Sequence, residues 1–354
     1  MKKENKKNNY YSPSKILKLK DLEGEEPSIY LITTNRSAGK TTSMLKRALE
    51  LFKVYGKKTI LMYRYQYEIS GSSAIFRDVL NMYPSYGEEM KSIPHAKGLF
   101  HELFLDDESF GFAVSLSNPD GLKKYSPMFA DVDMIIFDEF QCETGKYLNK
   151  EVEKFQSLYL TIARGGGSQS RQVKVFLLGN MVSIMNPYFI NLGIHKRLKD
   201  DTNFMRGNGW VAEFGFNESA SNSIKKNGFF KAFKNEGYMS YSTEKVYLVD
   251  SQVFIEKPKG RARYLCTIQH EGSSYGVREY YDEGIVHISK KPDKSCKQVI
   301  AFKPSDHNQN TIMLNHYSYM WKNIKDAFNN GYLRFDDIKS KSAIFDILAI
   351  DIYK

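Results

Sequence analysis

One stretch of the chain, NRSAGKTT at residues 35–42, has the composition of a phosphate-binding loop. Such a loop holds phosphates because successive backbone N–H groups point inward and the N-terminus of the following helix adds positive potential. Lys40 would neutralise the β- and γ-phosphate oxygens, and the Thr41 hydroxyl would bind Mg²⁺. The usual pattern is G-x-x-x-x-G-K-[ST], but Thr34 stands where the first glycine is expected, ahead of Gly39. That glycine supplies no ligand, so we predict that Thr34 is tolerated.

A pair of adjacent carboxylates follows the loop by about a hundred residues, at the end of the apolar run VDMIIFDEF, residues 132–140. Asp138 would hold Mg²⁺ through its water shell, while Glu139, which points differently, would polarise an attacking water. Asn180 ends another apolar run, VKVFLLGN, and would sense the γ-phosphate beside the Asp138 strand. Two plainer interpretations stay open: acidic residues often end a surface strand, and Asn is a common turn residue.

Short β-rich runs alternate with helical patterns along the first 200 residues. This alternation predicts an α/β domain with a parallel sheet that is covered on both faces. The expected strands span residues 27–34, 57–65, 111–117, 132–140 and 172–180, and the expected helices span 40–56, closed by Gly56, and 151–164.

The amino-acid composition changes near residue 207, where the chain becomes rich in Gly, Asn and Ser. We expect an ATPase-type domain over residues 1–206 and a connecting segment over 207–240. Short strands with turn signals, followed by a helical end, predict a smaller α+β domain over 241–354. No internal repeat of useful length is visible.

The composition limits the class of protein. A length of 354 residues suggests two domains, and 51 Lys and Arg against 41 Asp and Glu give a net charge of +10, which favours polyanionic partners. The cysteines Cys142, Cys266 and Cys296 show no C-x-x-C spacing, so neither a disulfide framework nor a cysteine zinc site is indicated. The start lacks an apolar signal core, and no apolar run approaches the ~20 residues of a membrane-spanning helix. We expect a soluble intracellular protein, with no membrane partner and a mobile N-terminal arm.

The order of several motifs resembles the DNA-packaging ATPases of phi29-like phages. After the GKT loop come IIFDEF, TIAR, LLGNMVSIMNPYF, DSQVFIEK and NNGYLRFD, which extend the resemblance over nearly the whole chain. The resemblance implies an additional-strand (ASCE) P-loop ATPase domain, a linker, and a C-terminal domain similar to the RNase H-like nuclease of large terminases. It also implies a homopentameric ring that works on double-stranded DNA at a viral portal and procapsid in the host cytoplasm. A structural packaging RNA is a further implied partner.

The resemblance also assigns roles to residues, with ATP and Mg²⁺ as the cofactors. Glu139 and Asn180 would be catalytic, Thr41 and Asp138 would hold the metal, and Arg164 in TIAR would act in trans on the neighbouring subunit's ATP. Arg36 matches an arginine of the family's phosphate loop. The residues assigned to the nucleotide are Thr34, Arg36, Ser37, Ala38, Gly39, Lys40, Thr41 and Thr42.

Two positions depart from the family or compete with its assignments. Gln66 stands where the family pattern has a lysine thought to face DNA, so Arg64 or Lys57 would have to replace that contact. Arg171 follows a glycine run just after Arg164 and is a competing candidate for the trans arginine.

The C-terminal domain lacks the carboxylates that an RNase H-like nuclease requires. Such a nuclease places one carboxylate inside its first core strand. If residues 263–272 form that strand, its interior offers Cys266, Ile268 and His270. Glu279 and Asp282 lie on or after the next strand. We therefore expect a fold that has kept its frame, has lost nuclease activity and presents basic residues to nucleic acid: Lys257, Lys259, Arg261 and Arg263.

Three functions remain open from the sequence. The resemblance implies an ATP-driven motor that moves double-stranded DNA into a procapsid and hydrolyses ATP at the subunit interfaces of a ring. Such a motor would hold DNA by its phosphates, because it must move any sequence. A helicase would share the ATPase elements but should show base-stacking aromatic residues along a single-strand channel. A non-hydrolysing nucleic-acid-binding scaffold should not retain the loop lysine together with the acidic pair.

Overall fold

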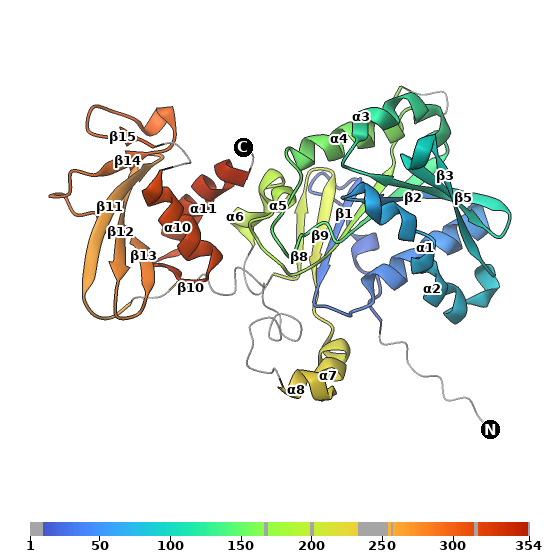
Figure 1. The fold of residues 1–354 in the computed structure, drawn as a ribbon, viewed down its shortest axis with the longest axis horizontal. Helices are drawn as coiled ribbons and strands as arrows, with labels where there is room; N and C mark the ends of the chain where they lie inside the picture. The colour runs from blue at the N-terminus through green and yellow to red at the C-terminus, as the bar shows by residue number, and fades with distance from the viewer. Residues whose placement is uncertain are drawn as a thin grey trace. The chain divides into compact units, whose positions relative to one another are not determined.

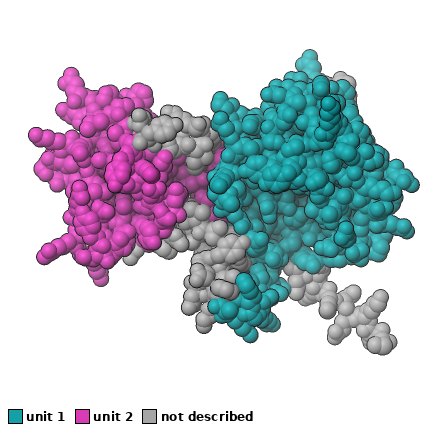
Figure 2. All heavy atoms as spheres, viewed as in Figure 1, with its two compact units in different colours: residues 1–181, 199–245 teal, residues 182–198, 246–354 magenta. Residues whose placement is uncertain are grey.

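A computed structural model describes residues 10–165, 169–198, 202–232, 254–255, 258–314 and 318–352. The chain forms two compact units, which Figure 2 colours separately. Unit 1 comprises residues 1–181 and 199–245, and unit 2 comprises residues 182–198 and 246–354. Residues 1–9 of the expected arm, residues 233–240 of the expected connecting segment, and Lys257 lie outside the described residues.

Unit 1 is built on a nine-stranded sheet in the order β3-β4-β5-β2-β6-β7-β1-β9-β8 (Figure 1). The pairs from β5 to β9 are parallel, whereas β3, β4 and β8 join as antiparallel edge strands. The strands are β1 Ile29–Thr34, β2 Lys58–Tyr63, β3 Met90–His95, β4 Phe100–Leu105, β5 Glu108–Ser115, β6 Val132–Asp138, β7 Lys174–Asn180, β8 Phe204–Gly207 and β9 Trp210–Phe214. The expected α/β class with a parallel-rich sheet is confirmed.

Helices cover both faces of this sheet, with α1 and α2 on one side and α3 and α4 on the other (Figure 1). The helices of unit 1 are α1 Lys40–Tyr55, α2 Arg77–Met82, α3 Pro119–Leu122, α4 Glu151–Ile162, α7 Glu218–Lys226 and α8 Gly228–Ala232. Helix α1 ends where the sequence predicts, because Gly56 adopts a left-handed conformation with φ 65° and its N–H bonds to the Phe52 carbonyl at 2.8 Å. Met44, Leu45 and Leu49 bury one side of α1 in the core.

The strand order explains why the candidate residues meet. Strand β7 lies between β1 and β6, which is the additional-strand arrangement implied by the sequence resemblance. In the register of the ladder, Thr34 pairs with Asn180, and Asp138 pairs with Leu178. The loop after β1, the acidic pair after β6 and Asn180 at the end of β7 therefore share the carboxyl edge of the sheet, where ligands of open α/β sheets bind.

The sheet continues beyond residue 206, where the sequence suggests a boundary. Strand β9 pairs in parallel with β1, and all of its five residues are buried. The turn residues of RGNG at 206–209 make the composition of this region similar to that of a linker. The apolar run WVAEF that follows is nevertheless part of the core. Residues 182–198 in turn belong to unit 2, although they precede β8 in the chain.

Unit 2 contains a seven-stranded mixed sheet in the order β10-β16-β13-β12-β11-β14-β15. Strands β11, β12 and β13 are antiparallel, and β14 and β15 continue in parallel from β11. The unit is the smaller α+β domain that the sequence predicts, and this strand pattern agrees with an RNase H-like frame. Its elements are α5 Pro187–Asn191, α6 Ile194–Arg197, β10 Phe254–Ile255, β11 Ala262–His270, β12 Ser273–Tyr280, β13 Ile285–Ser289, β14 Val299–Ala301, β15 Ile312–Met313, α10 Tyr319–Asn329, β16 Leu333–Phe335 and α11 Ile338–Ile352.

Two further sequence features can be compared with the structure. The cysteines Cys142, Cys266 and Cys296 are free thiols. Within the described ranges, no helix combines the length and apolarity needed to cross a membrane.

The backbones of β2 and β5 approach each other closely at Gly111. A Cβ at this position would lie 1.9 Å from the Thr59 carbonyl oxygen. We expect Gly111→Ala to lower the unfolding free energy of unit 1 by at least about 2 kcal/mol, since the backbones must separate. The fluorescence of Trp210 during urea unfolding measures this change in a Trp321→Phe background, because these are the two tryptophans of the chain.

The matched control is Gly71→Ala, since a Cβ at Gly71 would meet no atom within 4 Å. It should change the unfolding free energy by less than about 0.5 kcal/mol. Equal effects of the two substitutions would contradict the close approach of β2 and β5.

Candidate active site

The loop between β1 and α1 places a lysine ammonium in a polar cradle. Lys40 is the first residue of α1 and is 6% exposed. Its Nζ donates hydrogen bonds to Thr34 Oγ1 at 3.0 Å and to Asn180 Oδ1 at 2.9 Å. Thr34 is buried and is not among the residues with positive φ, so the missing glycine requires no special backbone conformation. The threonine also contributes a hydroxyl that a glycine would lack.

The acidic pair lies beside the first turn of α1. The Thr41 hydroxyl donates to Asp138 Oδ2 at 2.6 Å, and the backbone N–H of Glu139 donates to Asp138 Oδ1 at 3.0 Å. Glu139 adopts a left-handed conformation with φ 56°, which is uncommon for a residue other than glycine. The chain turns sharply after Asp138, so the Glu139 carboxylate takes a different direction from its neighbour, as the sequence analysis expects.

Burial shifts the pKa values of Lys40, Asp138 and Glu139. Burial lowers the pKa of Lys40 to about 8, although the nearby Asp138 and Glu139 carboxylates oppose this shift. Burial also raises the pKa of Asp138, against the hydrogen bond from Thr41 and the charge of Lys40. The pKa of Glu139 is raised by burial and then by the charges of Asp138 and Glu143. A polyanion with a divalent cation would neutralise these charges together.

A cavity of about 330 Å³ opens above these groups. Arg36 lies at this cavity, where its Nη1 forms a half-exposed ion pair with Glu143 Oε1 at 2.8 Å. The structure thus brings together nearly all residues that the sequence assigns to nucleotide and metal, with Thr34 buried under the lysine. The lining residues are Tyr10, Arg36, Ser37, Ala38, Gly39, Lys40, Thr41, Thr42, Asp138, Glu139, Gly179 and Asn180.

The sequence analysis missed two tyrosines of the N-terminal arm that are attached to the loop. Tyr11 donates its backbone N–H to the Ala38 carbonyl at 2.8 Å, and its carbonyl accepts a bond from Ser43 Oγ at 2.5 Å. Tyr10 packs so closely that a Cβ on Gly39 would lie 2.6 Å from its ring. The expectation of a mobile arm is therefore wrong from Tyr10 onward. Two tyrosines after a polar run give no signal of such a contact.

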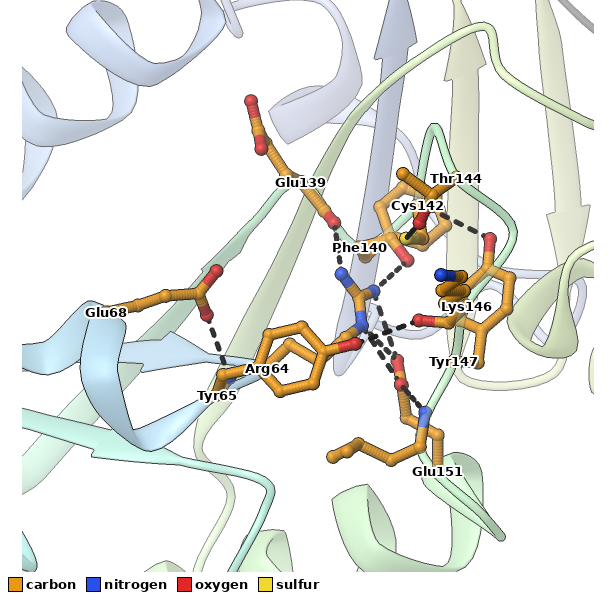
Figure 3. Close-up of polar contacts among 11 residues, drawn as sticks. Arg64, Tyr65, Glu68, Glu139, Phe140, Cys142, Thr144, Lys146, Tyr147 and Glu151 are labelled. Atoms are coloured by element: carbon orange, nitrogen blue, oxygen red, sulfur yellow. Dashed lines mark hydrogen bonds and ion pairs between the residues drawn. The ribbon is translucent and has the colours of Figure 1, made fainter.

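Arg64, at the end of β2, is buried beneath the loop that follows β6 (Figure 3). It forms an ion pair with Glu151 at 3.0 Å, in which the two side chains are 7% and 0% exposed. Its other nitrogens donate to the carbonyls of Phe140 at 2.7 Å and Glu139 at 3.2 Å. Figure 3 shows the Glu139 carbonyl directed toward Arg64 and its carboxylate directed away. Arg64 thus holds the backbone of Glu139 in its left-handed conformation.

This burial corrects the expectation that Arg64 could face DNA. Its guanidinium lies 5.2 Å from the centre of the Tyr147 ring and is enclosed by protein. Gln66 is also engaged, because its Nε2 donates to the Leu99 carbonyl at 3.0 Å and its Oε1 accepts from Ser115 at 2.9 Å. Of the three positions considered for this contact, only Lys57 is exposed.

The two candidates for a trans arginine differ in their surroundings. Arg164 is exposed, two residues beyond the end of α4. Arg171 instead donates to the carbonyls of Phe129 at 2.6 Å and Ile162 at 2.8 Å, and also to that of Val132. These bonds use the Arg171 guanidinium within its own subunit, so this geometry favours Arg164.

The basic residues of unit 2 lie on its surface, as expected for Lys259, Arg261 and Arg263. Glu279 pairs with Arg263 in the β11–β12 ladder, while His270 pairs with Ser273 at the opposite end of the hairpin. Glu279 and, beyond it, Asp282 are thus separated from His270 along the length of the strands.

Two curated relatives resemble the chain over nearly its whole length. The DNA packaging protein of Bacillus phage phi29 is 27% identical over 348 residues, and that of Bacillus phage PZA is 26% identical over 348 residues. Each match covers 96% of this chain and 96% of the relative.

Solved structures support the same overall fold. The bacteriophage Phi-29 viral genome packaging motor assembly contains a chain with a TM-score of 0.56 and 24% identity, and the match covers 98% of this chain and 99% of that chain. The Phi-28 gp11 DNA packaging motor gives a TM-score of 0.57 at 16% identity, with 98% of each chain covered. The profile of one protein family, described as Podovirus DNA encapsidation protein (Gp16), matches residues 5–351. With this match over almost the entire chain and a lysine, acidic pair and asparagine gathered at one cavity, the protein belongs to the podovirus DNA encapsidation family and is a phage DNA-packaging ATPase.

Proposed function

We propose that this chain is the ATP-hydrolysing subunit of a ring that moves double-stranded viral DNA into a procapsid. The observation that carries the proposal is the convergence of Lys40, Thr41 and the acidic pair at one cavity, in a chain of the DNA encapsidation family. Lys40 would contact the terminal phosphates, and the loop N–H groups would bind the remaining phosphate oxygens.

The metal position would be formed by Thr41 and Asp138, whose oxygens already lie 2.6 Å apart. Oxygen ligands of this kind suit Mg²⁺, so the residues present fit the ion. Bound Mg²⁺ would neutralise charge that develops on the phosphates during transfer. Thr41 would then exchange its bond with Asp138 for a metal contact, while Lys40 and Asn180 hold the γ-phosphate.

Glu139 would accept the proton of the attacking water. Its carboxylate must be ionised for this role, and the raised pKa brings it closer to the range in which a base is effective. Arg64 acts here as a positioning residue, because it holds the Glu139 carbonyl and so fixes the direction of the carboxylate. The same arginine is paired with Glu151, the first residue of α4.

Arg164 would complete the site of the neighbouring subunit. An arginine supplied by a neighbour can accelerate phosphoryl transfer by roughly 10³ to 10⁵ through charge stabilisation. Helix α4 begins at Glu151, beside Arg64, and Arg164 follows its end. Helix α4 would thus connect the backbone of Glu139, held by Arg64, to Arg164 of the same subunit, which would act on the ATP of the neighbouring subunit. We propose a homopentamer as the ring.

The remaining partners follow from charge and family. A net charge of +10 suits contacts with DNA phosphates, and a motor that must move any sequence gains nothing from reading bases. We propose that a viral portal, a procapsid and a structural packaging RNA are further partners. The proposed location is the host cytoplasm. Basic residues of unit 2, including Arg261 and Arg263, would contact nucleic acid without cleaving it.

ATP hydrolysis by the purified protein, measured with and without duplex DNA, tests this function. We expect duplex DNA to stimulate turnover more than single-stranded DNA does, because the ring holds a double helix. Glu139→Gln should bind ATP but lose at least about 100-fold in turnover, since the amide keeps the shape and loses the base. Stimulation by single strands alone would favour a helicase, and no turnover in an assembled ring would favour a scaffold.

The lowered pKa of Lys40 predicts proton uptake when ATP binds. A bound triphosphate adds negative charge and raises this pKa, so a lysine that is partly neutral above pH about 8 becomes protonated in the complex. ATP affinity should therefore fall as the pH rises through 8 to 9. Calorimetry at about pH 8.5, in two buffers of different ionisation enthalpy, measures the uptake.

Lys40→Arg is the control, because a guanidinium stays protonated throughout this range. If this variant still binds ATP, the binding should cause no proton uptake at residue 40. A wild-type protein that binds ATP with no proton uptake would show that Lys40 is already fully charged.

Mixed assemblies test the trans role of Arg164. An Arg164→Ala subunit keeps its own lysine, and a Lys40→Ala subunit keeps its own arginine, so each should be nearly inactive alone. Co-assembly should restore measurable hydrolysis, because some interfaces join an intact loop to an intact arginine. Arg171→Ala is the matched control and should lower stability without taking part in this rescue, since its guanidinium bonds within its own subunit. A lack of rescue in rings shown to be mixed would exclude the trans assignment.

A further inference from the structure

Unit 2 gathers imidazole and carboxylate side chains that the ATPase site does not use; His270 is buried, Asp346 is partly buried and Glu271 is exposed. His270 ends β11, Glu271 follows in the turn, and Asp346 lies on α11. His195 on α6 and Asp306 after β14 approach the same place. All five residues belong to unit 2, although they come from four separate parts of its sequence.

The distances within this group are too long for hydrogen bonds. His270 Nε2 lies 3.6 Å from Asp346 Oδ2 and 3.8 Å from Glu271 Oε1. His270 is only 2% exposed, and neither of its ring nitrogens has a hydrogen-bond partner among the described residues. Leaving a buried polar group without a partner is unfavourable, and a bound cation would supply a partner for this histidine.

The same distances suit two ligands of one metal ion. At a metal–ligand distance of about 2.1 Å, tetrahedral ligands lie about 3.4 Å apart. The candidate ligand atoms of His270, Glu271 and Asp346 all lie within 4.8 Å of one another. A small contraction would bring the three groups into coordination.

The His270 ring directs Nε2 toward the carboxylates of Glu271 and Asp346. A ligating histidine typically has its second ring nitrogen held by a carboxylate or a backbone carbonyl. His270 Nδ1 faces Asp306 Oδ2 at 3.8 Å, and His195 Nδ1 lies 3.4 Å from the Phe189 carbonyl. The Nε2 atom of His195 then points toward Asp346 Oδ1, at 3.6 Å.

We propose that unit 2 contains a site for a divalent transition-metal ion of the Zn²⁺ class, bound by His270 Nε2, Glu271 and Asp346. Imidazole combined with carboxylate favours such an ion over Mg²⁺ or Ca²⁺, which prefer oxygen alone. The ion would join the end of β11 and the turn after it to α11 within unit 2. The role is structural and carries no hydrolytic activity.

Two lysines compete with the ion for the carboxylates. Lys196 Nζ lies 2.8 Å from Asp346 Oδ1, and Lys303 Nζ lies 3.2 Å from Glu271 Oε1. The competing explanation is therefore an ion-pair cluster in which a protonated His270 is held by carboxylates and no metal binds. The two explanations predict opposite effects of removing Lys196. A metal should bind more tightly to Lys196→Ala, whereas the ion-pair cluster would lose stability and still bind no metal.

Zn²⁺ titration of the untagged full-length protein, by calorimetry without nucleotide, tests the proposal. All variants carry Asp138→Asn, so that the metal position of the ATPase site does not contribute. We expect one Zn²⁺ per chain, at least tenfold weaker affinity in Asp346→Asn and in His270→Gln, and tighter binding in Lys196→Ala. The control is His287→Gln, because His287 is also buried, lies 3.7 Å from the Asp336 carboxylate and is not one of the proposed ligands. It should leave the affinity unchanged.

Co²⁺ provides a readout that does not depend on how well a variant folds. Co²⁺ bound by the Asp138→Asn chain should show the strong visible absorption of a tetrahedral site, and Zn²⁺ should displace it. No binding at one ion per chain, an unchanged affinity in Asp346→Asn, or weaker binding in Lys196→Ala would each overturn the proposal. Circular dichroism of each variant confirms that loss of binding is not loss of the fold.

Discussion

The active site depends on one buried cation. The Lys40 ammonium is held in a nearly closed position by oxygens from two strands, Thr34 of β1 and Asn180 of β7. A buried ammonium is costly unless each proton finds an acceptor, and burial already lowers its pKa to about 8. The arrangement therefore requires β7 to lie directly beside β1 and both strands to end in register. The position of β7 between β1 and β6 then sets the distance from the lysine to Asp138.

A second constraint acts on Glu139, the proposed base. Glu139 has a positive φ, and such a conformation persists only where the surroundings fix it. Arg64 does so by bonding the carbonyls of Glu139 and Phe140 while it is paired with Glu151. A buried ion pair is stabilising only when its remaining N–H donors have acceptors. Here backbone carbonyls accept hydrogen bonds from those donors. The direction of the Glu139 carboxylate and the start of α4 are consequently set by the same guanidinium.

The sequence alone determined the local elements that build the site. The apolar runs of β1, β6 and β7, the helix that begins at Lys40 and its end at Gly56 follow from patterns of neighbouring residues. The acidic pair and Asn180 were found because they directly end such runs. The tolerance of Thr34 also follows locally, because its backbone is ordinary. The strands β3, β4, β8 and β9 were missed. The edge strands β3 and β8 are short and contain polar residues, and the turn residues at 206–209 disguised the apolar run of β9 that follows them.

Only the tertiary structure decided which distant side chains meet. Arg64 and Glu151 lie 87 positions apart, and no periodicity links them, so the same arginine could be placed at a DNA surface until its burial was known. Arg171 stayed a competing candidate to Arg164 until its bonds to three carbonyls were known. His270 likewise seemed alone in its strand, because its carboxylate neighbours come from α11 and from the segment after β14. Such contacts depend on the packing of whole elements, and a linear sequence carries no local record of that packing.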